Sequence, residues 1–242
     1  MKLFHSTYDE YYDAGVGEFP LPIRCVRNVA LAIVWAFALC MWRARMEDER
    51  YMLERSDGKG TVIICNHTSM AEVVSICTYL WRRGRIFRPI FKSEFGSHRI
   101  VEWVFSRAGG IPVERGTADM KSLRRAQHAL QRGEDVLIFP EGTRIRTDEQ
   151  PVEVHGGFAL MAQMGKTDIT PMAVCGFRDI TPAGKKVPRP KKCWMRAGEH
   201  VSFNDAPEGM KRRERSQWVE DLAVSRMYAL RDQLRAEHPG RF

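Results

Sequence analysis

Segments typical of buried strands alternate with segments typical of helices through the middle of the chain, and this alternation limits the possible folds most strongly. Residues 61–65 are a β-branched, apolar run that favours a buried strand, and residues 71–81 have helical spacing. The same reasoning predicts strands at 86–91, 110–113, 135–139 and 169–177, and helices at 100–105, between Asp119 and Gly133, and at 157–164. The pattern predicts an α/β fold, a mostly parallel sheet flanked by helices.

Composition excludes several classes of protein. The 242 residues are 44% hydrophobic and 28% charged, which is typical of a globular chain and not of a disordered, collagen-like or polytopic membrane protein. The net charge of +8 favours anionic partners such as nucleic acid, phosphorylated metabolites or acidic lipids, without choosing among them. The six cysteines lack the spacing of a zinc site or a disulfide framework, and the N-terminus does not resemble a secretion signal. We therefore expect a reducing, cytosol-facing location.

An apolar segment near the N-terminus indicates contact with a membrane. Residues 29–42 carry no charge and are flanked by arginines on both sides. As a helix, this segment would be about 21 Å long, shorter than the ~30 Å hydrocarbon core of a bilayer. Trp35 and Trp42 suit the headgroup level, so we expect a monotopic helix; a buried core helix is the alternative. Residues 1–50 are predicted to dock on the membrane, and residues 51–242 to form the globular domain.

Two further segments have simpler interpretations. Residues 216–236 have apolar side chains at helical spacing, which predicts an amphipathic helix packed on the domain. Residues 185–192 are rich in lysine, arginine and proline, which favours a solvated surface loop over a dedicated lipid or cofactor contact.

The first candidate site lies between the strand at 61–65 and the helix that follows it, where open α/β sheets expose functional groups. Asn66 and His67 come first, and Glu72 lies about one turn into the helix, from where its carboxylate can reach the imidazole. A carboxylate on one ring nitrogen fixes the tautomer and leaves the other nitrogen free to accept a proton. A general-base dyad is one interpretation, and a helix cap or surface pair is the other.

The other candidate sites also lie at strand ends. Residues 139–144 form a compact polar turn, in which Glu141 can bond hydroxyls and Arg144 can bind a phosphate with two hydrogen bonds. Arg115 and Lys92 close two other predicted strands. Cations at three strand ends are what an anionic substrate requires, although each alone is also typical of a solvated surface.

In this order, the segments resemble the 1-acyl-sn-glycerol-3-phosphate acyltransferase family, and the resemblance covers roughly residues 60–203. Asn66 and His67 with Glu72 match the first family block, in which the carboxylate is Asp. The second, third and fourth blocks match residues 110–115, 139–144 and 169–174. The Glu at position 72 leaves the acceptor and the subfamily open.

The resemblance implies an O-acyltransferase that moves a fatty acyl group from a thioester of coenzyme A or acyl carrier protein to a lysophospholipid, most simply making phosphatidate. It implies that His67 is the base and that Glu72 orients it. It also implies a peripheral or monotopic location on the cytoplasmic face of the cell membrane, with membrane lipids as partners, no nucleic acid, no metal and no cofactor. The implied substrate-binding residues are Lys92, Arg115, Glu141, Gly142, Thr143 and Arg144, with backbone N–H groups near Gly142 as oxyanion donors.

Three alternatives remain open. The acceptor can be another lysolipid, the protein can be a membrane or nucleic-acid binding module without turnover, or it can hydrolyse thioesters. Release of free thiol separates an enzyme from a binding module, and dependence of that release on the acceptor separates a transferase from a hydrolase.

Overall fold

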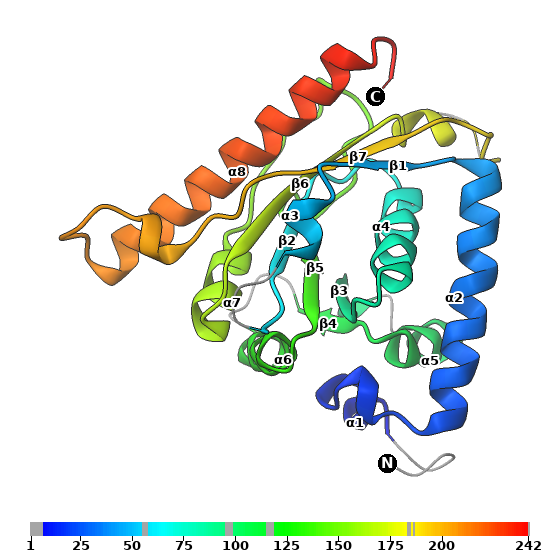
Figure 1. The fold of residues 1–242 in the computed structure, drawn as a ribbon, viewed down its shortest axis with the longest axis horizontal. Coiled ribbons are helices and arrows are strands. Elements are labelled where there is room, and N and C mark those ends of the chain that lie inside the picture. Colours follow the sequence, from blue (N-terminus) through cyan, green and yellow to red (C-terminus); the bar gives the residue numbers. More distant parts are fainter. Residues whose placement is uncertain are drawn as a thin grey trace.

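The computed structural model describes residues 7–54, 58–94, 99–114, 119–182, 185 and 187–241, built around one seven-stranded sheet (Figure 1). The strand order is β1-β7-β6-β2-β5-β3-β4. Every neighbouring pair is parallel except β6 and β7. The strands are β1 (Arg45–Glu47), β2 (Val62–Cys65), β3 (Phe87–Lys92), β4 (Ile111–Val113), β5 (Asp135–Ile138), β6 (Ile169–Cys175) and β7 (Trp194–Ala197). The predicted mostly parallel α/β sheet is confirmed.

Helices connect and cover the strands. The predicted cap at Asp119 is present, because its carboxylate accepts the N–H groups of Lys121 and Ser122 at 3.1 and 3.0 Å. The α-helices are α1 (Tyr8–Asp13), α2 (Leu21–Met41), α3 (Arg50–Leu53), α4 (Met70–Arg82), α5 (Arg99–Ala108), α6 (Met120–Gln131), α7 (Gly157–Gly165) and α8 (Arg212–Glu237). Short 3₁₀ turns lie at η1 (Val16–Glu18), η3 (Arg178–Ile180) and η4 (Phe203–Asp205).

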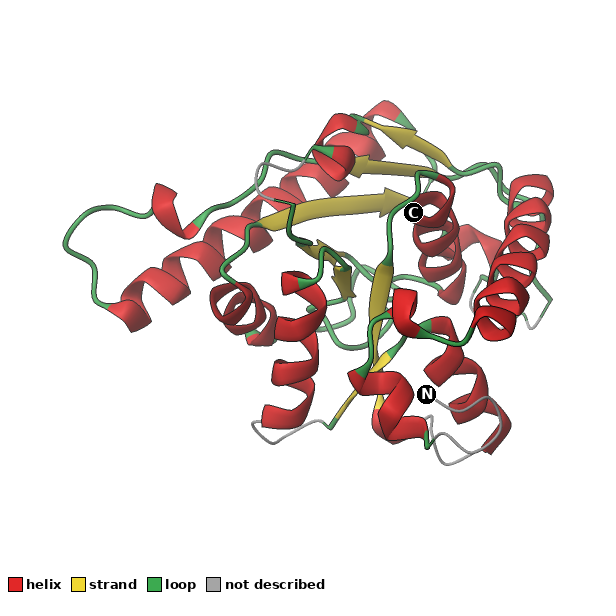
Figure 2. Ribbon diagram, turned by 60° about the horizontal axis from the view of Figure 1, so that its bottom comes forward, coloured by secondary structure: helices red, strands yellow, loops and turns green. Residues whose placement is uncertain are grey.

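The sheet is the middle of three layers, as Figure 2 shows with helices on both sides of the strands. Successive side chains of β2 alternate between the two faces. Ile63 and Cys65 join a buried cluster with α2 and α4, whereas Val62 and Ile64 join a cluster with α6, α7 and α8. Because both faces are covered, β2 is apolar at every position, as the sequence indicates.

Two strands at one edge of the sheet were not predicted. β1 has three residues, two of them charged, and β7 is a run of four residues that an arginine interrupts directly after the basic loop, so neither shows the longer apolar run of the central strands. Pairing with neighbours defines both: β7 runs antiparallel to β6, and β1 adds in parallel to β7. The predicted strand at 169–177 is shorter than expected and ends at Cys175.

Helix α2 is longer than the sequence predicted. It begins at Leu21 and includes Arg24 and Arg27, which were expected to end the apolar segment. Its 21 residues measure about 31 Å, so the prediction that the helix is too short to span a bilayer was wrong. Within the described part of the chain it is the one helix long and apolar enough to cross a membrane. The side chain of Arg27 contacts the rest of the protein, because it donates to the Ala108 carbonyl at 3.2 Å.

Residues before position 51 share the core with the rest of the chain. The guanidinium of Arg88 is fully buried and donates to the carbonyls of Tyr12 and Ala14 at 2.8 and 2.9 Å. It also pairs with Glu134 at 3.1 Å. Trp42 is buried in the α2–α4 cluster. The division at residue 50 stays a prediction, and these contacts cross it.

The C-terminal helix packs as predicted, although it begins at Arg212 instead of residue 216. Val219, Ala223 and Met227 are fully buried against the sheet, and in Figure 1 α8 lies along the opposite side of the strands from α2. The described part of the basic loop, residues 185 and 187–192, contains no helix or strand and is mostly exposed, as expected for a surface loop. Its Lys186 lies outside the described residues.

Candidate active site

The loop between β2 and α4 is fixed by Asn66. The side-chain amide of Asn66 donates to the carbonyl of Val174 at 3.3 Å and accepts the N–H of Val174 at 2.8 Å. Both bonds go to β6, the neighbour of β2 in the sheet. Asn66 therefore anchors the chain at the point where His67 leaves the strand.

Glu72 combines the two interpretations that the sequence left open. Its fully buried carboxylate accepts the N–H groups of Thr68 and Ser69 at 2.6 and 2.9 Å, which makes it part of the capping box of α4. The same oxygen lies 2.7 Å from Nδ1 of His67. A carboxylate held by this many donors has little freedom to move. It favours the tautomer with the proton on Nδ1, which leaves Nε2 to accept a proton.

His67 links the strand end to the predicted polar turn at 139–144. Its ring packs on that of Phe139 with centroids 4.3 Å apart. The backbone N–H of His67 donates to the carboxylate of Glu141 at 2.8 Å, and the backbone carbonyl of His67 accepts the N–H of Ile145 at 2.7 Å. The two segments, which are more than seventy residues apart in the sequence, are brought together as one site.

A cavity of about 530 Å³ lies beside this dyad. His67 lines it together with Lys92 and Arg144, two of the predicted phosphate-binding cations. Much of the remaining lining is apolar and comes from several elements, including Val73, Phe91, Phe105, Ile138 and Met161. The cavity therefore combines a base, two cations and an apolar wall, which suits a substrate that has an anionic end and a hydrocarbon chain.

Glu141 has different contacts from those expected of a residue that holds a substrate hydroxyl. It is buried and does not line the cavity. One carboxylate oxygen accepts the His67 N–H, and the other accepts the hydroxyl of Tyr228 from α8 at 3.1 Å. Burial raises the pKa of Glu141, and the two hydrogen bonds oppose that rise. These contacts indicate that Glu141 holds the backbone of His67 in position.

Sequence reasoning missed Tyr228. Its hydroxyl donates to Glu141, and burial followed by the nearby Glu141 charge raises the pKa of Tyr228, which keeps the hydroxyl protonated. The one indication in the sequence is that Tyr228, a polar aromatic residue, directly follows Met227 on the packing side of an amphipathic helix. That pattern gave no indication of the partner, because the two residues lie 87 positions apart.

The expected oxyanion donors near Gly142 are already bonded. The N–H of Gly142 donates to the Phe139 carbonyl at 2.9 Å, and that of Thr143 donates to the Glu141 carbonyl at 2.7 Å. Gly142 has φ +60°, a left-handed conformation in which glycine is not strained. Gly142 and Thr143 both line the cavity, so they shape it. Because their own N–H groups have protein acceptors, they do not supply the expected donors in this structure, and oxyanion donors near Gly142 stay a prediction. Arg115, the remaining predicted cation, lies outside the described residues.

A family comparison agrees with this geometry. The family model described as Acyltransferase matches residues 44–175, more than half of the chain. The chain belongs to the Acyltransferase family. The match begins just before β1 and ends with β6, so it contains both His67 and the turn at Glu141.

Named relatives of this Acyltransferase chain act on lysolipids. A chloroplastic 1-acyl-sn-glycerol-3-phosphate acyltransferase of Arabidopsis thaliana is 27% identical over 52% of the chain and 34% of its own length. The 1-acyl-sn-glycerol-3-phosphate acyltransferase of Bacillus subtilis is 28% identical over 48% of the chain and 56% of its own length. The lyso-ornithine lipid O-acyltransferase of Pseudomonas aeruginosa is 30% identical over 38% and 35%. The chain thus spans about a third to just over half of these relatives.

A solved structure is similar in fold. The crystal structure of the 1-acyl-sn-glycerophosphate acyltransferase PlsC from Thermotoga maritima aligns with a TM-score of 0.58. The alignment covers 89% of this chain and 85% of that one at 19% identity. The similarity therefore extends beyond the family match to most of the Acyltransferase chain described above.

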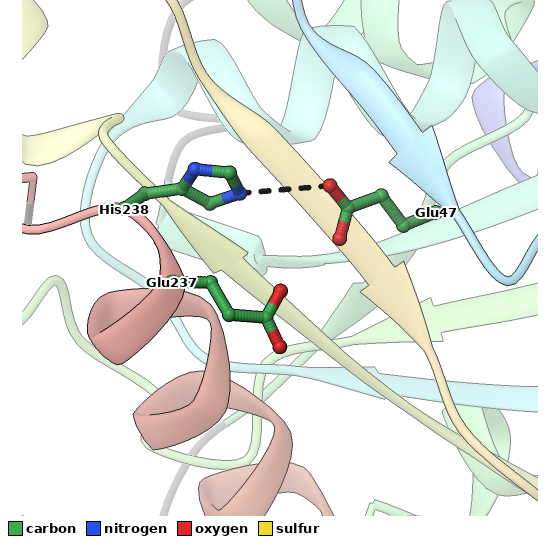
Figure 3. Close-up of side chains that lie close together, drawn as sticks. All are labelled: Glu47, Glu237 and His238. Carbon is green, nitrogen blue, oxygen red and sulfur yellow. Dashed lines mark ion pairs between the residues drawn. The ribbon is translucent and has the colours of Figure 1, made fainter.

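A second cluster of titratable side chains lies at the β1 edge of the sheet (Figure 3). One potential metal-ligand atom from each of three side chains lies within 4.8 Å of the others: a carboxylate oxygen of Glu47, one of Glu237, and a ring nitrogen of His238. Arg196 already bridges the two carboxylates, donating to Glu47 and to Glu237 at 3.0 Å. A cation placed between these oxygens would have to displace the guanidinium, so the group fits an ion-pair network better than a metal centre.

Proposed function

We propose that this chain transfers a fatty acyl group from a thioester to the free hydroxyl of a lysophospholipid, most simply 1-acyl-glycerol-3-phosphate, giving phosphatidate. The observation that supports this most is the His67–Glu72 dyad beside a cavity that also contains Lys92 and Arg144. The family membership and the names of the relatives agree with the same chemistry.

In the proposed reaction, Nε2 of His67 takes the proton of the acceptor hydroxyl as its oxygen attacks the thioester carbonyl. The tetrahedral intermediate collapses, its carbon–sulfur bond breaks, and the thiolate leaves. His67 returns the proton to the thiolate, so the imidazole is regenerated. Glu72 balances the positive charge that His67 carries in between, from a position fixed by the cap of α4.

The cavity lining supports the placement of both substrates. Arg144 and Lys92 bind the acceptor phosphate in this proposal, and Arg115 remains a candidate for the same role. The apolar lining receives hydrocarbon chain. Glu141 acts through the backbone of His67 and does not touch the hydroxyl.

The donor in this proposal is acyl-CoA or an acyl carrier protein thioester, and the proposed steps require no metal or cofactor. We further propose that the chain is peripheral or monotopic on the cytoplasmic face of the membrane. The exposed side of α2, which includes Leu21, Val29, Ile33 and Phe37, supports contact with lipid.

An acceptor screen tests the proposed function. Purified protein receives acyl-CoA with lysophosphatidate, with another lysophospholipid, with lyso-ornithine lipid, or with no acceptor, while thiol release and lipid products are measured. Phosphatidate made only with lysophosphatidate is expected. The Pseudomonas relative makes lyso-ornithine lipid the second candidate acceptor. Thiol release without an acceptor would indicate a hydrolase, and no release with any acceptor would indicate a binding module.

A sedimentation experiment tests the proposed membrane contact. Ile33 and Phe37 are changed together to Ser, and binding to phospholipid vesicles is compared with that of a variant in which Val152 and Val187, exposed outside α2, are changed to Ser. We expect the α2 variant to lose binding and the control to keep it. Equal binding by both variants would place the contact elsewhere.

A further inference from the structure

A second cavity, of about 290 Å³, lies between α2, α4 and the β1–β7 edge of the sheet. None of its lining residues lines the cavity beside His67. Trp35 and Leu39 come from α2, and Ser75, Tyr79 and Arg82 come from α4. It is therefore a separate site that the proposed acyl transfer does not use.

One polar group in this lining has no partner. The hydroxyl of Ser75 is buried without a hydrogen bond to any described residue, and the whole residue is 4% exposed. Buried polar atoms are nearly always satisfied by protein, water or ligand. Because Ser75 lines the cavity, a ligand there can supply the missing bond.

The charges of the lining are unbalanced. Arg83 forms an ion pair with Glu49, whose carboxylate also accepts the hydroxyl of Tyr79 at 2.9 Å. Arg82 lies 4.3 Å from the ring centroid of Trp35 and has no carboxylate partner among the described residues. The site therefore keeps one positive charge that a phosphate can neutralise.

The α2 side of the cavity is apolar and continues onto an exposed surface. Leu39 lines the cavity and is 48% exposed, and Phe37 and Ile33 lie exposed on the same helix. A ligand that satisfies both sides needs an anionic group beside a hydroxyl donor, and hydrocarbon that extends over α2. A membrane glycerophospholipid has both parts.

We propose that the α2–α4 cavity binds the phosphate and glycerol of an anionic membrane glycerophospholipid whose acyl chains lie along the exposed side of α2. Arg82 binds the phosphate, and the Ser75 hydroxyl bonds a phosphate or ester oxygen. This lipid is neither acyl donor nor acceptor; it fixes how the chain sits on the bilayer. The inference rests on the proposed membrane contact of α2 and is independent of turnover.

A photo-crosslinking experiment tests this site directly. Vesicles of phosphatidylcholine contain a minor fraction of phosphatidylglycerol that carries a diazirine in one acyl chain, and crosslinked peptides of the full chain are mapped by mass spectrometry. We expect crosslinks in α2 and α4. Arg82→Gln and Ser75→Val are each expected to lower their yield, with Arg82→Gln causing a loss of about tenfold, as for one charged hydrogen bond.

Control variants separate binding in the α2–α4 cavity from general attraction of lipid to a basic surface. Arg213→Gln removes a charge that, like that of Arg82, is exposed, at the start of α8, and is expected to leave the yield unchanged. Circular dichroism establishes that each variant is folded.

The proposal is overturned if Arg82→Gln and Ser75→Val give the same crosslink yield as the native chain, or if Arg213→Gln lowers the yield as much as Arg82→Gln does. It is also overturned if inorganic phosphate competes as well as lipid does. Because the readout needs no turnover, crosslinking can succeed even where the acceptor screen fails.

Discussion

Among the residues that the structure describes, two histidine–glutamate pairs have different surroundings. In the first, Glu72 is fully buried, lies 2.7 Å from Nδ1 of His67, and also accepts two backbone N–H groups. In the second, Nε2 of His238 lies 3.5 Å from Glu47, whose carboxylate is shared with Arg196. The His238 ring stacks on Trp194 with centroids 3.9 Å apart.

The difference shows what the proposed general-base pair has beyond the two residue types. The carboxylate of Glu72 is held by the start of a helix and has the imidazole as its one titratable partner in the described hydrogen bonds. That of Glu47 is already neutralised by a guanidinium. Of the two histidines in these pairs, His67 lines the large cavity and His238 does not. In the proposed mechanism the first pair moves a proton, whereas the second joins the end of α8 to the edge of the sheet.

The largest effect is expected for His67→Ala. Removing the base should lower kcat by about 100-fold to 10,000-fold. In the described lining of the cavity, His67 is the one group that Glu72 orients to accept the proton of the acceptor hydroxyl. Thiol release in the presence of lysophosphatidate measures this rate. His238→Ala is the matched control and should keep the native rate. Near-native turnover by a folded His67→Ala protein would remove His67 from the mechanism.

Glu72→Gln separates charge from shape. Gln can still accept the N–H groups at the start of α4, so the cap and the fold should persist. The imidazolium loses its counter-charge, and we expect kcat to fall by roughly 100-fold. Glu72→Asp keeps the charge at shorter reach and should fall between Gln and the native chain. If Glu47→Gln lowers kcat as much as Glu72→Gln does, the contrast between the two pairs fails.

Arg144→Gln should weaken the acceptor more than the donor. The loss of one charged hydrogen bond to phosphate predicts a rise of about tenfold in KM for lysophosphatidate, with little change in KM for the thioester. Arg146, which is exposed and does not line the cavity, provides the control variant Arg146→Gln. A rise confined to the thioester KM would assign Arg144 to the donor.

Tyr228→Phe should have a smaller effect on the same dyad. The ring is kept and one hydrogen bond to Glu141 is lost, which corresponds to a reduction in kcat of about fivefold if the full bond strength reaches His67. A purely structural role would lower the melting temperature and leave kcat unchanged, so both are measured. Tyr51→Phe, which keeps a ring remote from Glu141, is the control.

The smallest effect is expected at the second pair itself. Glu47→Gln should leave kcat and both KM values within about twofold, because a partly exposed ion pair contributes little free energy. Thermal unfolding should show a slight loss of stability. A large loss of activity in a folded Glu47→Gln protein would mean that the β1 edge takes part in the reaction.

Local relationships were predictable from the sequence. His67 and Glu72 lie five positions apart across a strand-to-helix junction, so the spacing allowed both a dyad and a helix cap, and the structure contains both contacts. The alternation of apolar segments likewise predicted the central strands. Lys92 and Arg144 come together at one cavity because parallel strands end at the same edge.

Long-range relationships were not predictable. The bond from Tyr228 to Glu141 and the pairing of β1 with β7 join segments far apart in the chain, and no local pattern encodes them. Glu141 follows a strand, as the other candidate residues do. In the folded chain, however, both of its carboxylate oxygens accept hydrogen bonds from protein groups. The length of α2 was underestimated because the sequence places Arg24 and Arg27 before the apolar segment, whereas both lie within the helix and Arg27 bonds to the Ala108 carbonyl.

The stoichiometry of one reaction decides whether His67 drives acyl transfer to a lysophospholipid. Acyl-CoA and lysophosphatidate are incubated with the native chain, and free thiol and phosphatidate are quantified in the same sample. We predict equal molar amounts of the two products, no thiol above background when lysophosphatidate is omitted, and neither product with His67→Ala. Thiol released without phosphatidate, or phosphatidate formed equally by His67→Ala, would contradict the proposed mechanism.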